Sequence, residues 1–142
     1  MRENMGLFHG KRIDNGEWVE GHFFTQVYAP ETIEEDWYCF IKPIGSETLE
    51  SYRVDPDTVG ECSGVPDKNG KRIFEGDILL LDDIRGFVNY GRGCFCVRMP
   101  HPDYLYRSNP AIDIVLNEYP GLEVIGNIHD NPELLKGGTG SG

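Results

Sequence analysis

The sequence predicts a mainly β fold, with an N-terminal β-hairpin extension and short helical turns. Eighteen glycines and nine prolines are spread through its 142 residues. Because both residues interrupt regular structure, this spacing suits many short strands better than long helices. Hydrophobic residues make up 39% of the chain, so it can bury a core as one domain, or as one barrel with a β-rich extension.

The N-terminal region, residues 1–55, opens with a predicted hairpin. Asp-Asn-Gly at residues 14–16 is a strong hairpin signal and predicts a type I′ turn, which needs positive φ at both central residues. The outgoing strand carries apolar side chains at odd and even positions, so we expect it to be covered on both faces. These side chains are Trp18, Val19, Phe23 and Phe24.

The rest of this region predicts a second hairpin. Residues 26–36 lose the apolar periodicity and gather carboxylates, as an acidic loop does. Residues 37–44 and 51–54 then predict two strands that pair across a long loop. Asp55 precedes Pro56, a combination that predicts a capped single helical turn.

Residues 56–136 form the predicted barrel region. Asp-Lys-Asn-Gly at residues 67–70 reverses the chain, and Ile73 and Phe74 return to the core. Gly-Asp-Ile then leads into a strand over residues 78–81, with further strands over 87–90 and 94–99. This succession of short strands and turns is typical of an SH3-like barrel.

The C-terminal part of the barrel region predicts two last strands, over residues 112–116 and 122–128. Asn-Pro-Glu at residues 131–133 predicts a helical turn that lays two leucines on the core. Residues 137–142 contain only Gly, Thr and Ser and predict a flexible tail.

Several of these segments together resemble a known family, the YopX-like proteins, which are found mainly in bacteriophages and prophage-like elements. The motifs are GKRIDNGEWVEG at residues 10–21, VDPDTVG at 54–60, GVPDKNGKRIFEGDI at 64–78 and EVIGNIHDNPELL at 123–135. The resemblance implies a small, mostly β protein with an SH3-like barrel and no established activity. The chain departs from the family pattern at Cys62 and in residues 100–110, which adds a loop.

Four cysteines are too sparse for a disulfide scaffold, and the first residues lack the apolar stretch of an export signal, so we expect reduced thiols. Cys94 and Cys96 stand two apart in an apolar run, and a strand would place both sulfurs on one face. A zinc site needs four ligands, and the four histidines are scattered singly. We therefore expect no metal and no other cofactor.

Charge limits the possible partners. Thirteen basic against 24 acidic residues give a net charge of −11, which argues against direct binding to nucleic-acid phosphates. The acidic excess suits solubility, or a partner protein with a basic face. No apolar run is long enough for a membrane span, so we expect a location in the cytoplasm of a bacterial host.

The candidate binding residues are Tyr104, Tyr106 and Arg107, because tyrosine and arginine are enriched at binding hot spots. The alternative is that both tyrosines cover the end of the barrel. Catalytic residues are not predicted. The carboxylates of Asp77, Asp82 and Asp83 stand where strand ends need turn formers, so we read them as solvated turn residues.

These observations predict a non-enzymatic protein-interaction module of a phage or prophage, which binds a host protein, a phage protein or itself. One alternative is an acidic DNA mimic that inhibits a basic host nucleic-acid-binding protein. Another is an enzyme whose site forms only at an oligomer interface. Self-association is expected because an apolar strand such as residues 37–41 often covers a sheet edge with a second copy.

Overall fold

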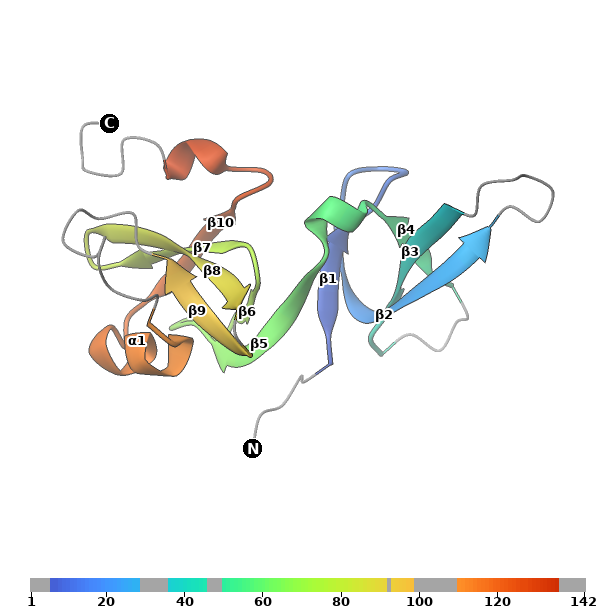
Figure 1. The fold of residues 1–142 in the computed structure, drawn as a ribbon. Helices are drawn as coiled ribbons and strands as arrows, with labels where there is room; N and C mark the ends of the chain where they lie inside the picture. The colour runs from blue at the N-terminus through green and yellow to red at the C-terminus, as the bar shows by residue number, and fades with distance from the viewer. Residues whose placement is uncertain (1–5, 29–35, 46–49, 92, 99–109, 136–142) are drawn as a thin grey trace. The chain divides into compact units, whose positions relative to one another are not determined.

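The structure is a computed structural model that describes residues 6–28, 36–45, 50–91, 93–98 and 110–135. Two antiparallel sheets hold most of the described residues, and one α-helix accompanies them (Figure 1). The predicted mainly β fold is confirmed. Internal contacts divide the described chain into a first unit, which ends at Cys62, and a second unit, which begins at Ser63. No helix within the described ranges is long and apolar enough to cross a membrane.

The first sheet has six strands in the order β4-β3-β2-β1-β5-β6. Their bounds are β1 Phe8–Lys11, β2 Trp18–Tyr28, β3 Asp36–Pro43, β4 Tyr52–Val54, β5 Gly60–Pro66 and β6 Arg72–Phe74. β2 runs antiparallel to both β1 and β3, and β3 runs antiparallel to β4. The predicted opening hairpin and the predicted long-looped hairpin are therefore both confirmed.

The turn between β1 and β2 differs from the predicted type I′ geometry. The backbone N–H of Arg12 donates to the carbonyl of Glu17 at 2.8 Å, and the N–H of Gly16 donates to the carbonyl of Arg12 at 2.9 Å. Gly16 has a φ of 75°, whereas Asn15 has no positive φ. The prediction was wrong because four residues, rather than two, close this loop, and only the last of them needs the left-handed conformation.

The two faces of this sheet differ, so the expectation of a strand covered on both faces was wrong. Ile41 and Val54 are fully buried on one face, in the middle of β3 and at the end of β4. On the other face of β2, His22 and Phe24 are exposed. Strand side chains alternate between faces, and around His22 and Phe24 only one of the two faces is covered.

The predicted single helical turn after β4 is confirmed as η1, Pro56–Thr58. The carboxylate of Asp55 accepts a hydrogen bond from the N–H of Asp57 at 3.0 Å. The hydroxyl of Thr58 donates to the carbonyl of Asp55 at 2.6 Å and accepts from the N–H of Lys11 at 2.9 Å. This buried hydroxyl thereby ties the helical turn to β1.

The second sheet has four strands in the order β10-β7-β8-β9. Their bounds are β7 Asp77–Leu81, β8 Ile84–Gly91, β9 Cys94–Arg98 and β10 Glu123–Asn127. β9 and β10 stand at opposite edges, so this sheet stays open over the described residues. The SH3-like barrel is not confirmed and stays a prediction.

One predicted strand is a helix. Residues 112–116 belong to α1, Ile112–Glu118. Ile112 and Val115 are both buried, three residues apart, whereas Ile114 is 54% exposed, and this spacing is that of one helical face.

The predicted turn near residues 131–133 is confirmed as η3, Pro132–Leu134.

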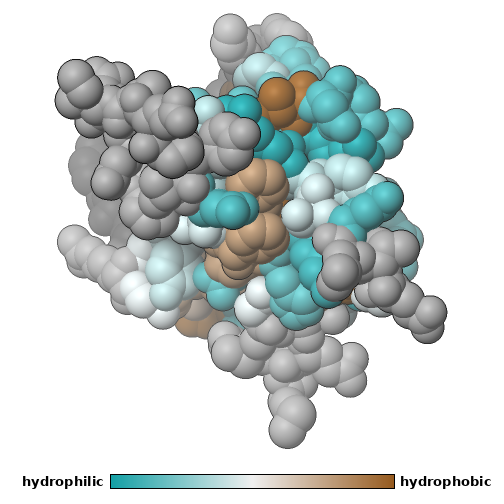
Figure 2. Space-filling model, turned by 90° about the vertical axis from the view of Figure 1, so that its right-hand side faces the viewer, coloured by the Kyte–Doolittle hydropathy of each residue, from teal (hydrophilic) through white to brown (hydrophobic). Residues whose placement is uncertain are grey.

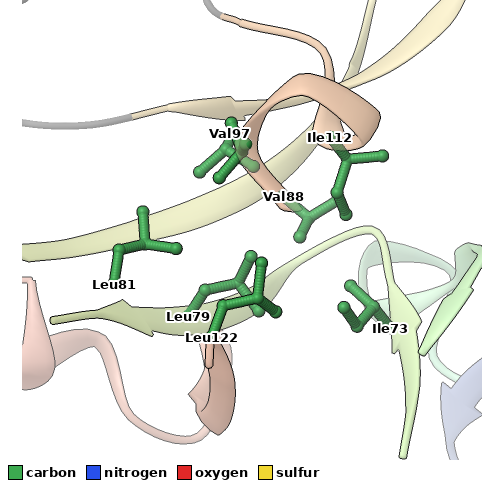
Figure 3. Close-up of a cluster of buried hydrophobic side chains, with 8 residues drawn as sticks. Ile73, Leu79, Leu81, Val88, Val97, Ile112 and Leu122 are labelled. Atoms are coloured by element: carbon green, nitrogen blue, oxygen red, sulfur yellow. The ribbon is translucent and has the colours of Figure 1, made fainter. Parts of the chain in front are cut away.

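The core of the second unit lies between the four-stranded sheet and α1. Figure 3 shows aliphatic side chains from β6, β7, β8, β9 and α1 converging with Leu122, which precedes β10. The cluster contains Ile73, Leu79, Leu81, Val88, Val97, Ile112, Val115 and Leu122. Because these residues come from segments far apart in sequence, their burial holds the C-terminal unit together.

Two aspartates are buried in turns, and one of them, Asp77, was expected to be solvated. Asp67 and Asp77 are 6% and 5% exposed. The Asp67 carboxylate accepts backbone hydrogen bonds within its own turn, and that of Asp77 accepts one from the N–H of Phe74 at 2.8 Å. Backbone donors replace the lost water contacts, so both carboxylates act in turn structure. Asp82 and Asp83 are exposed, as expected.

Candidate functional site

The predicted binding residues Tyr104, Tyr106 and Arg107 lie outside the described residues, so the structure does not test that prediction. The described residues bring other aromatic and basic side chains together, on the exposed face of the first sheet. Figure 2 shows hydrophobic residues in the middle of one view of the molecule, with hydrophilic residues around them.

Two phenylalanines form the centre of this exposed face. Phe24 of β2 lies directly opposite Phe40 of β3 in the strand register. Their rings are stacked, with centroids 5.3 Å apart and planes inclined by 11°. A cross-strand aromatic pair of this kind stabilises the two-strand ribbon, by roughly 0.2–1 kcal/mol relative to an alanine pair.

An arginine on the neighbouring strand extends the stack. Arg53 of β4 is directly opposite Phe40, and its guanidinium carbon lies 3.7 Å from the centre of the Tyr38 ring. This is cation–π contact distance. We call the four residues Phe24, Tyr38, Phe40 and Arg53 the aromatic-arginine face. Its neighbours on the same face of β2 and β3 are His22, Gln26 and Lys42.

A second arginine lies over an aromatic ring near the turn between β1 and β2. The guanidinium carbon of Arg12 lies 3.8 Å from the centre of the Tyr52 ring, and its Nη2 lies 2.7 Å from the Asp14 carboxylate. The hydrogen bond from Arg12 lowers the pKa of Asp14 below its usual value. The hydrogen bond from the Tyr52 hydroxyl to Glu50 raises the pKa of that tyrosine. These contacts hold Arg12 in place.

The chemistry of the aromatic-arginine face is that of a binding surface. Flat aromatic rings offer apolar area at a low cost in side-chain entropy, and the guanidinium offers several hydrogen-bond donors in one plane. Among the described residues, His, Cys, Asp and Glu form no group of three or more that could hold a metal ion. The face can therefore contact a partner through stacking, apolar burial and charge-assisted hydrogen bonds.

Sequence reasoning missed this face because the signal lies in the register between strands. The alternation of aromatic residues is visible within residues 22–24 and 38–40, yet it does not say which residues of the two strands lie opposite each other. Only the pairing of Phe24 with Phe40, and of Phe40 with Arg53, brings the three side chains together.

The C-x-C pair is placed as predicted. Cys94 and Cys96 both lie in β9, and their Sγ atoms are 3.2 Å apart, so the two sulfurs share one face of the strand. Cys94 is exposed and Cys96 is buried. Neither of them contributes to the aromatic-arginine face, which belongs to the other unit.

Fold and surface together define a mainly β protein with an exposed aromatic and basic sheet face. The chain belongs to the YopX family: the family model, described as YopX protein, matches residues 8–136, nearly the whole chain. No curated protein matches it. Among solved structures, the chain is similar to the crystal structure of protein EF1440 from Enterococcus faecalis. The two are 25% identical, with a TM-score of 0.47 over 91% of this chain and 96% of that chain.

Proposed function

We propose that this YopX family member is a non-enzymatic protein-interaction module of a phage or prophage, which acts in the cytoplasm of a bacterial host through the aromatic-arginine face. One observation carries the proposal: Phe24 is 38% exposed although its ring is stacked on Phe40. A second layer of side chains on this face would bury apolar area that water now contacts.

The composition of the face supports a protein partner. Aromatic residues and arginine are enriched where protein interfaces are energetically important. Arg53 is exposed while it lies over Tyr38, so its guanidinium is already held against a ring. A partner that places an apolar side chain on Phe24 and a carboxylate beside Arg53 would complete both contacts.

The charge of the whole chain supports the same reading. At a net charge of −11, the molecule repels nucleic-acid phosphates over a distance of roughly one Debye length, about 8–10 Å at physiological salt. The same field attracts a partner with a basic surface around the contact. The expected partner is therefore a protein of the host or the phage; a second copy of this chain, which is the alternative, would have to bind against the repulsion between two chains that each carry −11.

Affinity capture tests the proposal. The tagged chain is incubated with lysate of its bacterial host, with and without nuclease, beside the double variant Phe24→Ser, Arg53→Gln and the control variant Ile114→Ser. Ile114 is also exposed and apolar, but lies in α1 of the other unit. We expect one stoichiometric protein with the wild type and the control, and at least about tenfold less with the double variant, as for hot-spot residues.

Other outcomes would contradict the proposal. Equal capture by all three chains would mean that binding does not use this face. A captured basic nucleic-acid-binding protein that added DNA displaces would favour the DNA mimic instead. Recovery of the bait alone, together with a monomeric mass in solution, would remove the support for an interaction module and redirect the search to small ligands.

A further inference from the structure

The two cysteines of β9 form a close pair at a sheet edge. Their Sγ atoms are 3.2 Å apart, nearer than the sulfurs of two thiols in ordinary van der Waals contact. β9 pairs with β8 through Gly91 opposite Cys94 and Asn89 opposite Cys96, so the ladder holds the backbone at both positions. The pair therefore has one thiol open to solvent and one thiol covered, within reach of each other.

A shared metal ion fits this pair less well than a disulfide. Two thiolates on a tetrahedral zinc ion lie about 3.8 Å apart, given zinc–sulfur bonds of about 2.3 Å. The observed separation is shorter, and the residues that the structure describes supply no third His, Cys, Asp or Glu to the site. A bond between the sulfurs requires a separation of about 2.05 Å. The two sulfurs would have to come closer together to form it, whereas they would have to move apart to bind a shared zinc ion.

Strand geometry indicates that such a bond would be readily reversible. Residues two apart in a strand have Cα atoms about 6.6–6.8 Å apart. This is the upper limit of the Cα separations that disulfides span, so closing the bond requires a local contraction of the strand. Disulfides under such strain are more easily reduced than relaxed ones, which is the property of a labile bond rather than a structural one.

We propose that Cys94 and Cys96 form a reversible dithiol–disulfide site, which low-molecular-weight disulfides such as glutathione disulfide oxidise. In the first step the Cys94 thiolate attacks one sulfur of the small disulfide, forms a mixed disulfide and releases one thiolate. In the second step the Cys96 thiol gives its proton to the thiolate released in the first step, and its sulfur attacks Cys94 Sγ, closes the bond within the strand and releases the second thiolate. The two protein thiols lose two protons and two electrons, and the small disulfide becomes two thiols.

The environments of the two sulfurs assign these roles. Burial, together with the hydrogen bond to Cys94, raises the pKa of Cys96 to about 11, so this thiol stays protonated at neutral pH. The exposed Cys94 is the sulfur that a dissolved disulfide can reach. Cys96 then resolves the mixed disulfide, because its sulfur already lies beside that of Cys94.

The test follows the oxidation state of one peptide. The full-length protein is equilibrated in glutathione buffers from fully reduced to fully oxidised, free thiols are blocked with iodoacetamide, and the chain is digested with trypsin. Cleavage after Arg92 and Arg98 releases residues 93–98, which contain both cysteines and neither Cys39 nor Cys62. We expect this peptide to become unalkylated and lighter by two hydrogens in oxidised buffer, and doubly alkylated again in reduced buffer.

Single substitutions test the two roles, with circular dichroism to verify that each variant is folded. In oxidised buffer, Cys96→Ser should accumulate the glutathione mixed disulfide at Cys94 at least about tenfold more than the wild type, because the resolving thiol is missing. Cys94→Ser should accumulate at least about tenfold less glutathione mixed disulfide on the same peptide than Cys96→Ser, because the remaining thiol, that of Cys96, is covered. Cys96→Ala also removes the resolving thiol and should give the same result as Cys96→Ser.

Three results would overturn the proposal. The first is a peptide that stays doubly alkylated in every buffer while the protein is folded. The second is a disulfide that joins Cys94 of two copies of the chain. The third is an equal amount of mixed disulfide in the wild type and in Cys96→Ser, which would show that Cys96 does not resolve it.

Discussion

The carboxylate of Asp67 accepts a hydrogen bond from the backbone N–H of Val124, 3.1 Å away and 57 residues further along the chain. Its other oxygen accepts from the N–H groups of Asn69 and Lys71, at 2.8 and 2.9 Å. One buried side chain therefore closes the turn between β5 and β6 and fastens it to β10.

The Asp67→Asn substitution should destabilise the protein by about 1–3 kcal/mol at pH 7, because an amide cannot accept all three hydrogen bonds. Burial by itself would raise the pKa of Asp67, but the backbone donors of Val124, Lys71 and Asn69 outweigh it and the pKa lies below its usual value. A carboxylate with a lowered pKa in the folded state stabilises the fold above the unfolded-state pKa of roughly 4, and this stabilisation is lost as the pH falls through the folded pKa.

Urea unfolding at a series of pH values measures both effects. The difference in unfolding free energy between the wild type and Asp67→Asn should be largest near neutral pH and should shrink as the solution becomes more acidic than pH 4. A difference that stays constant down to pH 2 would show that the charge of Asp67 does not contribute.

Replacing Thr58 with valine should cost about 1–2 kcal/mol. The side chain keeps its shape, but the N–H of Lys11 loses the hydroxyl that accepts its hydrogen bond in a part-buried position. Thr58→Ser keeps the hydroxyl and is the matched control. Thermal unfolding of the three proteins should rank the wild type and the serine variant close together, with the valine variant lower; a valine variant as stable as the wild type would refute the role of this hydrogen bond.

Gly21→Ala should disrupt the pairing of β2 with β3. A Cβ atom at residue 21 would lie 1.9 Å from the carbonyl oxygen of Lys42, which is backbone and cannot turn away. We expect a loss of at least about 1–3 kcal/mol, as for overpacking. Both tryptophans, at residues 18 and 37, belong to the first unit, so tryptophan fluorescence during urea unfolding reports on this sheet.

The matched control for this substitution is Gly121→Ala. A Cβ atom at residue 121 would meet no atom within 4 Å. This variant should be as stable as the wild type, or more stable by about 0.4–1 kcal/mol through the loss of chain entropy in the unfolded state. If both alanine variants unfold alike, the close approach at Gly21 is not the cause.

Leu79→Ala should cost about 2–5 kcal/mol, because Leu79 is fully buried in the core cluster of the second unit and its truncation leaves a cavity. Ile114→Ala removes a similar amount of side chain from an exposed position of α1 and should change stability by no more than about 0.5 kcal/mol. Far-UV circular dichroism in urea compares the two midpoints. Equal midpoints would show that the cluster does not stabilise the sheet.

The predictions that the structure confirms rest on local chemistry. The turns at residues 55–58 and 67–70 follow from the residue types that occupy them, since the Asp55 side chain needs only its neighbours to cap η1. The same local reasoning failed at residues 112–116. A short apolar run satisfies strand and helix patterns equally, and contact with the core decided between them at Ile112 and Val115.

The candidate site was less predictable, because its residues meet only through strand pairing. No local pattern places Arg53 beside Tyr38, which lies across a loop on another strand. For the same reason the burial of Asp67 was missed: the partner that covers it, Val124, belongs to the last strand. Long-range pairing, not residue type, determines both features.

The link between Asp67 and Val124 also has a consequence for synthesis on the ribosome, because its two residues are made 57 positions apart. Strands β1 to β4 are complete once Val54 has left the exit tunnel, and their pairing with one another needs no later residue. The sheet of the second unit stays without its edge strand β10, and the turn at Asp67 without its distant donor, until translation has passed Asn127. We therefore expect the growing chain to fold from its N-terminus, and a truncation before residue 123 removes the strand that pairs with β7 at the edge of the second sheet.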